Sequence, residues 1–150
     1  MTIDNKSALI VVDVQYDFLP GGSLAVERGD AVVPVLNDYI ARFDAADAPI
    51  YATRDWHPDD HISFEARGGI WPPHCVQGSK GAAFHHELAL PDDVTIISKG
   101  DDPEREAYSG FQGTDLAERL RSQGVERIYV GGLATDYCIK NMVLDGLKAV

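Results

Sequence analysis

The sequence predicts an α/β fold with three layers: a doubly wound, mostly parallel, Rossmann-like sheet with helices on both faces. Short runs of apolar, often β-branched residues alternate with segments that have helical spacing. No repeat, low-complexity tract or linker interrupts this alternation. Strand–helix–strand units require crossover connections, which make neighbouring strands parallel. At 150 residues, the chain has the size of one domain with one sizeable core.

Four apolar segments are the predicted strands. The first, SALIVVDV, is an unbroken apolar run up to Asp13, as expected for a strand buried on both faces. The predicted strands are residues 7–14, 48–54, 93–99 and 126–132. The connection from residue 54 to residue 94 is long and rich in Gly, Pro, His and Trp. Long ordered loops of this kind usually carry function.

Three helices are predicted between and after these strands. Asp30 is the expected cap of the first, whose apolar positions repeat with a period near 3.6. These positions are Val32, Val33, Leu36, Ile40 and Phe43. Thr114 is the expected cap of a short second helix, which Gly124 ends. The third helix is expected to begin near Thr135 or Asp136.

This third helix is still running at Val150, without a glycine stop or a following strand. We therefore expect residues 1–150 to form a single domain that lacks its C-terminal strand and helix. Without these two elements, the sheet would end in an exposed, unpaired apolar edge strand.

Composition and charge exclude several classes of protein. Thirteen basic residues against 24 acidic ones give a net charge of −11, so the chain has no basic stripe for nucleic acid. The longest apolar run, ALIVV, is too short to span a membrane, and the N-terminus has no signal-peptide layout. Two cysteines make no disulfide framework, which favours a cytoplasmic location. A small neutral substrate suits this protein, and a homo-oligomer is compatible with the sequence.

The polar residues that follow the strands form the main functional signal. Ligands bind beyond the carboxyl ends of strands in open parallel sheets. The four predicted strands bring to this edge Asp13, the Asp55–His57 pair, Lys99 and Cys138.

Cys138 is a candidate nucleophile. At the third residue of the last helix it would lie where free N–H groups and the helix dipole stabilise a thiolate. The same N–H groups can hold an oxyanion. Asp13 would accept the thiol proton, and Lys99 would stabilise both anions. The alternatives are a structural Asp13, a surface Lys99 and a buried, inert Cys138.

One carboxylate and several histidines in the long loop form a candidate metal site. Aspartate with two or three histidines suits Zn²⁺, Fe²⁺ or Mn²⁺, with water completing the shell. The candidate ligands are Asp55, His57, His61 and His74. Ordinary surface histidines are the alternative, and we assign His85 and His86 to that class.

Cys75 lies directly beside His74, in WPPHCVQG. Neighbours on an extended segment point to opposite sides, so Cys75 should face away from the metal into packing. The competing non-enzymatic hypothesis is a binding protein whose structural zinc site uses Cys75, His74, His61 and His57.

Five motifs together carry a family resemblance. They are VVDVQYDFLPGGSL, TRDWHPDDHISF, WPPHCVQG, KGDDPEREAYSGF and GGLATDYCI, in this order over nearly the whole chain. The sequence thereby resembles the nicotinamidase/pyrazinamidase branch of the isochorismatase-like hydrolases, which have the α/β fold expected above.

The resemblance implies a role for each matching residue. The catalytic triad would be Asp13, Lys99 and Cys138. The metal ligands would be Asp55, His57 and His74, with His61, or less readily Ser63 or Glu65, completing the shell. The oxyanion hole would be the N–H groups of Ala134 and Cys138, with a cis peptide at Leu133–Ala134. Phe18, Trp71, Tyr108 and Ala134 would bind the substrate, although Phe18 and Tyr108 also suit ordinary packing.

The implied activity is hydrolysis of a linear amide (EC 3.5.1 class). Nicotinamide would give nicotinic acid and ammonia through a cysteine thioester, in NAD salvage, with pyrazinamide as a further substrate. Its ring nitrogen would sit on the metal or on a metal-bound water. One alternative is an amidohydrolase of carbamoyl or maleamate-type substrates, a class that generally lacks the metal ligands Asp55, His57 and His74. Another is an isochorismatase-type vinyl-ether hydrolase, which needs no nucleophilic thiol.

Overall fold

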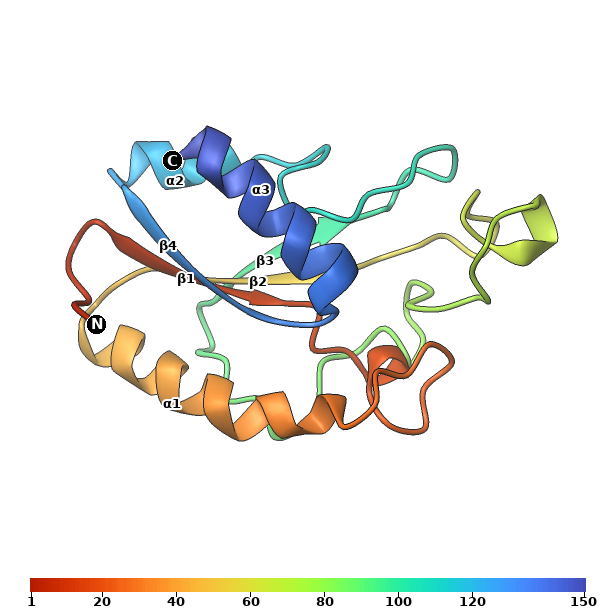
Figure 1. Ribbon diagram of the computed structural model, residues 1–150, viewed down its shortest axis with the longest axis horizontal. Helices are drawn as coiled ribbons and strands as arrows, with labels where there is room; N and C mark the ends of the chain where they lie inside the picture. The colour runs from red at the N-terminus through yellow and green to blue at the C-terminus, as the bar shows by residue number, and fades with distance from the viewer.

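A four-stranded parallel sheet forms the centre of the molecule (Figure 1). The computed structural model describes residues 1–150. The strands are β1 (Ser7–Val12), β2 (Ile50–Asp55), β3 (Thr95–Lys99) and β4 (Arg127–Gly132), in the order β3-β2-β1-β4. All three pairings are parallel, so the predicted fold class is confirmed.

Helices cover both faces of this sheet, which gives the three layers (Figure 1). α1 (Val32–Ala45) covers one face, and α2 (Leu116–Ser122) and α3 (Lys140–Ala149) cover the other. Side chains of β1 alternate between the two cores: Ile10 packs with the core of α2 and α3, and Val11 with that of α1. Burying each such side chain stabilises the fold by about 1.5–3 kcal/mol.

The first strand ends two residues earlier than the sequence pattern predicts. Asp13 has φ +51°, a left-handed backbone conformation that breaks the extended ladder. The chain then turns into the short 3₁₀ helix η1 (Tyr16–Phe18). The break therefore falls at the predicted catalytic aspartate.

The predicted helix starts are wrong in detail. Asp30 lies inside the 3₁₀ turn η2 (Gly29–Ala31), and Ala31, with no side-chain cap, precedes α1. Asp115 rather than Thr114 is the cap position of α2, although the Thr114 hydroxyl accepts the Leu116 N–H at 3.3 Å. Tertiary packing, not capping, sets these starts.

The last helix also differs from the prediction at its beginning. A π-helical turn, η4 (Thr135–Ile139), comes first, and the regular helix α3 begins only at Lys140. π-helical turns of this kind are frequent at functional sites.

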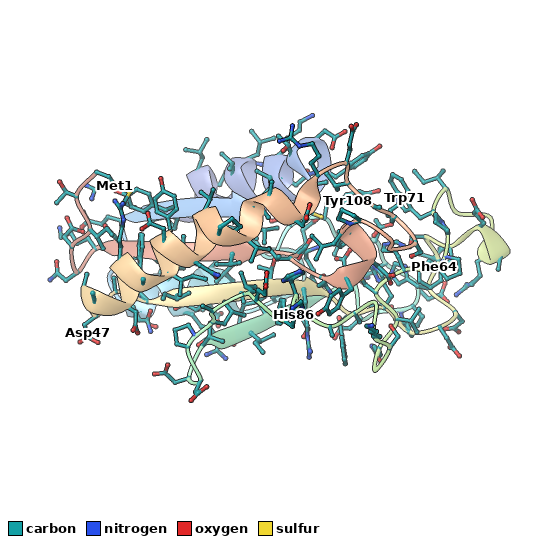
Figure 2. All side chains as sticks on the ribbon, turned by 90° about the horizontal axis from the view of Figure 1, so that it is seen from below. Met1, Asp47, Phe64, Trp71, His86 and Tyr108 are labelled. Atoms are coloured by element: carbon teal, nitrogen blue, oxygen red, sulfur yellow. The ribbon has the colours of Figure 1, made fainter.

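The long loops gather at the carboxyl ends of the strands. The connection between β2 and β3 contains one 3₁₀ turn, η3 (Glu65–Arg67), and reaches well beyond the sheet (Figure 1). Trp71, Tyr108 and Phe64 lie at the opposite end of the molecule from Met1 and Asp47 (Figure 2). None of the helices combines the length and the apolar character needed to cross a membrane.

Candidate active site

The register of the sheet brings the ends of all four strands together. Val12 of β1 pairs with Thr53 of β2 on one side and with Gly132 of β4 on the other, and Asp55 pairs with Lys99. The chain after β1 leads to α1 on one face, and the chain after β4 leads to α3 on the other. A crevice opens at such a switch point in doubly wound sheets.

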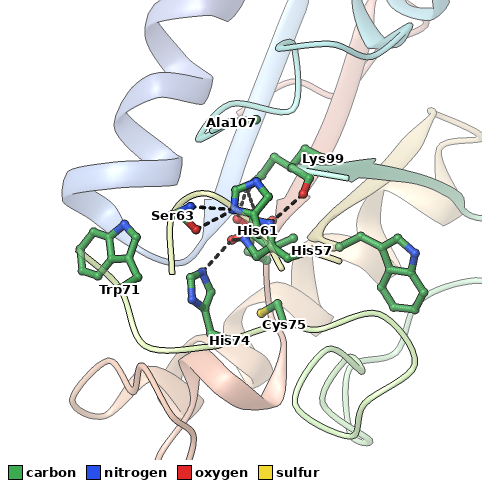
Figure 3. Close-up of polar contacts among 12 residues, drawn as sticks. His57, His61, Ser63, Trp71, His74, Cys75, Lys99 and Ala107 are labelled. Atoms are coloured by element: carbon green, nitrogen blue, oxygen red, sulfur yellow. Dashed lines mark hydrogen bonds and ion pairs between the residues drawn. The ribbon is translucent and has the colours of Figure 1, made fainter. Parts of the chain in front are cut away.

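Lys99 is the centre of a buried polar cluster (Figure 3). Its Nζ lies 2.9 Å from Asp13 Oδ2, forms a close ion pair with Asp55 Oδ1, and donates to Cys138 Sγ at 3.5 Å. One buried cation therefore touches the predicted base, the predicted nucleophile and a predicted metal ligand.

The two carboxylate oxygens of Asp13 have different surroundings. Oδ1 accepts a hydrogen bond from the Thr53 hydroxyl at 2.7 Å. Oδ2 forms the ion pair with Lys99 but accepts no hydrogen bond. Donor and acceptor atoms of Asp13, Asp55 and Cys138 lie within 4.8 Å of one another. Asp13 Oδ2 is thus free to take a proton from the neighbouring thiol.

Burial and charge shift the pKa values in this cluster in opposite directions. Burial raises the pKa of Asp13, and the nearby Lys99 only partly offsets this. Burial would also raise the pKa of Asp55, but the attraction of Lys99 prevails and holds that pKa well below its usual range. Burial alone would lower the pKa of Lys99, yet the two carboxylates raise it well above the ordinary value. These shifts favour charged Asp55 and Lys99 and are consistent with the predicted role of Asp13 as the proton acceptor.

Cys138 lies inside the π-helical turn η4, buried (5% exposed as a residue) at the edge of a pocket. Burial raises the pKa of the thiol well above its usual range, and Asp13 adds to this effect. The raised pKa favours the neutral thiol, so the predicted role as a nucleophile would require a proton acceptor. The Leu133–Ala134 peptide is cis, and the Ala134 N–H donates no hydrogen bond within the protein.

Three potential metal ligands, Asp55, His57 and His74, lie together beside this cluster, and Figure 3 shows the two histidines. Asp55 Oδ2 lies 3.5 Å from His57 Nε2 and 3.8 Å from His74 Nε2. His57 Nδ1 is held by the Gly100 carbonyl and His74 Nδ1 by the Pro72 carbonyl, both at 2.8 Å, which turns each Nε2 lone pair inward.

His57 Nε2 is buried and has no hydrogen-bond partner. A buried, unpartnered nitrogen that faces a carboxylate and a second imidazole is an arrangement that a divalent cation satisfies. These donors therefore fit a divalent metal ion.

The fourth predicted ligand, His61, does not join this trio; it lies instead in a second group of potential ligand atoms with His57 and Glu106, all within 4.8 Å of one another. His61 Nε2 donates to the Arg105 carbonyl at 2.8 Å, and its Nδ1 lies 2.7 Å from Ser63 Oγ. Both ring nitrogens are engaged, so His61 must rotate before it can bind a metal. Ser63 is occupied by the same contact, and Glu65 is exposed in η3.

A pocket of about 200 Å³ opens onto Cys138, Asp55 and His74. It is lined mainly by apolar and aromatic groups, and all four predicted substrate-binding residues are among them: Phe18, Trp71, Tyr108 and Ala134. The Trp71 indole N–H donates to the Tyr108 hydroxyl at 3.3 Å, which fixes both rings. The volume suits a single aromatic ring with a small substituent.

Tyr137 also lines this pocket, and the sequence patterns did not single it out. Its ring packs edge-on against Trp71, with centroids 5.2 Å apart, and lies 5.6 Å from the Tyr108 ring. Its position next to Cys138 at the start of a helix was the available signal.

Cys75 is buried and packs with Phe18, Leu19, Ala82 and Leu133, as expected. The reason differs from the prediction, since its backbone is left-handed (φ +47°) rather than extended. It belongs to none of the clusters of potential metal ligands, which contradicts the structural zinc site that would use it. His85 and His86 stack on each other beside Tyr16, away from the pocket.

Gln15 is a buried residue that the sequence patterns also missed. Its side-chain amide donates to the carbonyl groups of Asp55 (2.8 Å) and Ala82 (2.9 Å), and its oxygen accepts the Asp55 N–H at 2.9 Å. Gln15 thereby fixes the backbone of a predicted metal ligand.

Comparison with known proteins agrees with this geometry. The model of the isochorismatase domain family matches residues 7–149. The chain belongs to the isochorismatase family. This confirms the resemblance found in the motifs. The nicotinamidase/pyrazinamidase of Mycobacterium tuberculosis is 43% identical, covering 94% of this chain and 78% of its own length.

Solved structures of other members are also similar. The Pyrococcus horikoshii pyrazinamidase in complex with zinc is 56% identical, with a TM-score of 0.93 over 96% of this chain and 79% of that one. PnC1 from L. infantum in complex with nicotinate is 38% identical, with a TM-score of 0.91 over 99% of this chain and 78% of that one.

Proposed function

We propose that this isochorismatase-family chain is a nicotinamidase that hydrolyses nicotinamide to nicotinic acid and ammonia, and pyrazinamide likewise. One observation carries the proposal: a buried lysine joins a carboxylate and a thiol at the edge of a small aromatic pocket. The similarity to the nicotinamidase/pyrazinamidase of M. tuberculosis supports the same activity. Its proposed role is NAD salvage, and its proposed location is the cytoplasm.

The chemistry begins with a proton transfer from Cys138 Sγ to Asp13 Oδ2. The thiolate attacks the carboxamide carbon, and Lys99 stabilises the charges that develop on both partners. The N–H groups of Ala134 and Cys138 would hold the tetrahedral oxyanion. As the C–N bond breaks, Asp13 returns the proton to the leaving nitrogen, which departs as ammonia and leaves a thioester on Cys138.

Hydrolysis of the thioester reverses these roles. Asp13 takes a proton from an entering water, whose oxygen attacks the carbonyl carbon, and gives that proton back to the sulfur when the C–S bond breaks. Nicotinic acid is released, and the thiol is restored. The buried cluster requires no other proton donor.

Asp55, His57 and His74 would hold one divalent metal ion. When bound, the ion supplies a Lewis-acid anchor for the substrate's ring nitrogen, directly or through a water. We propose Zn²⁺, because two imidazoles and a carboxylate suit it and because the similar P. horikoshii pyrazinamidase was solved with zinc. Fe²⁺ and Mn²⁺ remain alternatives for this donor set.

The aromatic walls would orient the pyridine ring between the metal ligands and the thiol. Phe18 lies next to His74, with ring centroids 5.8 Å apart, and Trp71 and Tyr108 form another wall. Aromatic surfaces bind a flat ring at low entropic cost. An open-chain carbamoyl acid would leave these walls unfilled, which favours nicotinamide over the carbamoyl alternative.

Ammonia release from nicotinamide by the purified, zinc-loaded protein tests the proposal. Cys138→Ala should lose at least about 10³-fold in kcat, because no thioester can form. Cys75→Ala is the matched control and should retain most of the activity, since Cys75 lies only in apolar packing. Release of ammonia by Cys138→Ala at the wild-type rate, or no release by the wild type, would refute the proposal.

A further inference from the structure

Asp17 is a carboxylate for which the mechanism has no use, although it lies four residues after Asp13 in η1. Its Oδ2 accepts the N–H of Cys75 at 2.8 Å, and its Oδ1 accepts the N–H of Ser23 at 3.3 Å. These two amides belong to loops that are far apart in the sequence. One follows the predicted metal ligand His74, and the other leads into the pocket wall.

The contact with Cys75 acts on the peptide that follows His74. Cys75 has a left-handed backbone (φ +47°), which is unfavourable for a residue other than glycine and persists only where surrounding contacts hold it. The Asp17 carboxylate supplies such a contact on the backbone, and apolar packing supplies it on the side chain. On the other side, the Pro72 carbonyl fixes the His74 ring. His74 is therefore held from both directions.

The contact with Ser23 acts on the pocket wall. The Leu24 N–H donates to the Asp17 carbonyl at 2.9 Å, and Leu24 and Val26 line the pocket. The Ser23 hydroxyl in turn donates to the Pro73 carbonyl at 2.9 Å, directly before His74. The wall loop and the metal-ligand loop are thus joined twice, once through Asp17 and once through Ser23.

A third loop packs against the Asp17 carboxylate so closely that position 81 has room only for glycine. A Cβ atom added at Gly81 would lie 2.0 Å from Asp17 Oδ2, and the Gly81 carbonyl accepts the Asp17 N–H at 3.0 Å. The carboxylate is therefore fixed in one position. It is not among the clusters of potential metal-binding atoms.

We infer that Asp17 is a positioning residue that holds His74 and the pocket wall in register, so that the metal ligand and the substrate wall form one unit. This inference rests on the proposed function for its metal site. Asp17 acts through the backbone of the segment that carries His74. Loss of the carboxylate should therefore weaken metal binding and substrate binding together, as outer-sphere changes at metal sites generally do.

The test measures the Zn²⁺ dissociation constant of the full chain by competition with a chromophoric chelator. Asp17→Ala should bind Zn²⁺ about tenfold or more weakly than wild type and show a raised KM for nicotinamide. Asp17→Asn keeps one acceptor oxygen and should lie between the two. Asp92→Asn, on the exposed loop before β3, is the matched control and should equal wild type.

The affinity of Asp17→Ala for Zn²⁺ decides the inference. A value within twofold of wild type in a folded Asp17→Ala would overturn it, as would a wild type that binds no Zn²⁺. If Asp17→Ala fails to fold, Asp17→Asn must bind Zn²⁺ more weakly than Asp92→Asn, and equal affinities would reject the inference. A wild type that binds Zn²⁺ but releases no ammonia rejects the proposed function alone.

Discussion

At the scale of single residues, Asp13 is defined by the unequal partners of its two oxygens. Thr53 occupies Oδ1, whereas Oδ2 faces Lys99 and lies within reach of the thiol. The sequence predicts Asp13, because a carboxylate interrupts an apolar strand. It does not predict Thr53, because Thr53 becomes adjacent only through the register of β1 against β2.

Replacing Thr53 by valine removes this hydrogen bond while conserving the shape of the side chain. An unsatisfied buried acceptor costs about 1–3 kcal/mol, and a misdirected Oδ2 would accept the thiol proton less readily. We expect Thr53→Val to lower kcat for nicotinamide by about tenfold to hundredfold. The Thr53→Ser variant, which keeps the hydroxyl, should recover most of the loss. Equal kcat values for valine and wild type would show that the bond has no catalytic role.

The pKa of Asp13 sets the acid limit of the activity. Asp13 must be ionised to accept the thiol proton, and burial raises its pKa, so activity should fall as the pH drops through a value above the ordinary aspartate pKa of about 3.9. The measurement is kcat/KM against pH at two saturating Zn²⁺ concentrations. If the acidic fall of this profile shifts with the Zn²⁺ concentration, it reports loss of metal. If its midpoint lies below the ordinary aspartate pKa, the role of Asp13 is contradicted.

At the scale of elements, the four strands and the functional residues at their carboxyl ends could be predicted from the sequence. The exact starts of the helices could not. Apolar runs identify β1 to β4 because burial on both faces leaves a continuous signal. The caps assigned to Asp30 and Thr114 fail because tertiary packing decides where those helices begin. The π-helical turn that holds Cys138 has no sequence pattern of its own. The orientations of the His57 and His61 rings likewise depend on carbonyl groups far along the chain, those of Gly100 and Arg105.

Gly132 ends β4 directly opposite Val12 of β1. Its φ is +141°, and an added Cβ would lie 2.0 Å from the Val12 carbonyl oxygen. Gly132→Ala should therefore lower the free energy of unfolding by about 2–4 kcal/mol in urea titrations, through overlap and backbone strain together. Gly124→Ala is the control: φ is also positive there, but the space is open, so about 1 kcal/mol is expected. Equal losses at both sites would show that the close approach is unimportant.

At the scale of the whole molecule, the sheet directs four distant segments to one crevice. A central β1 between β2 and β4 places Asp13 beside both the metal ligands and the nucleophile. The fold and the convergence were predictable from the order of strands. The supporting hydrogen bonds of Gln15 and Asp17 could not be predicted, because they connect loops whose paths no local sequence pattern specifies.

Removal of the metal should leave this framework intact. The two main cores pack against the sheet, and neither contains any of the metal ligands. We expect prolonged dialysis against a strong chelator to abolish ammonia release while the far-UV circular dichroism spectrum remains unchanged, and Zn²⁺ to restore activity. Unfolding on chelation would instead indicate a structural metal site.

The central claim is that Cys138 carries the acyl group. The most direct measurement is mass spectrometry of the protein quenched with acid during turnover of nicotinamide, followed by digestion and mapping of the adduct. We predict a nicotinoyl thioester on the peptide that contains Cys138 and none on the peptide that contains Cys75. A nicotinoyl adduct on Cys75, or turnover with no adduct on Cys138 even at the shortest quench times, would contradict the account.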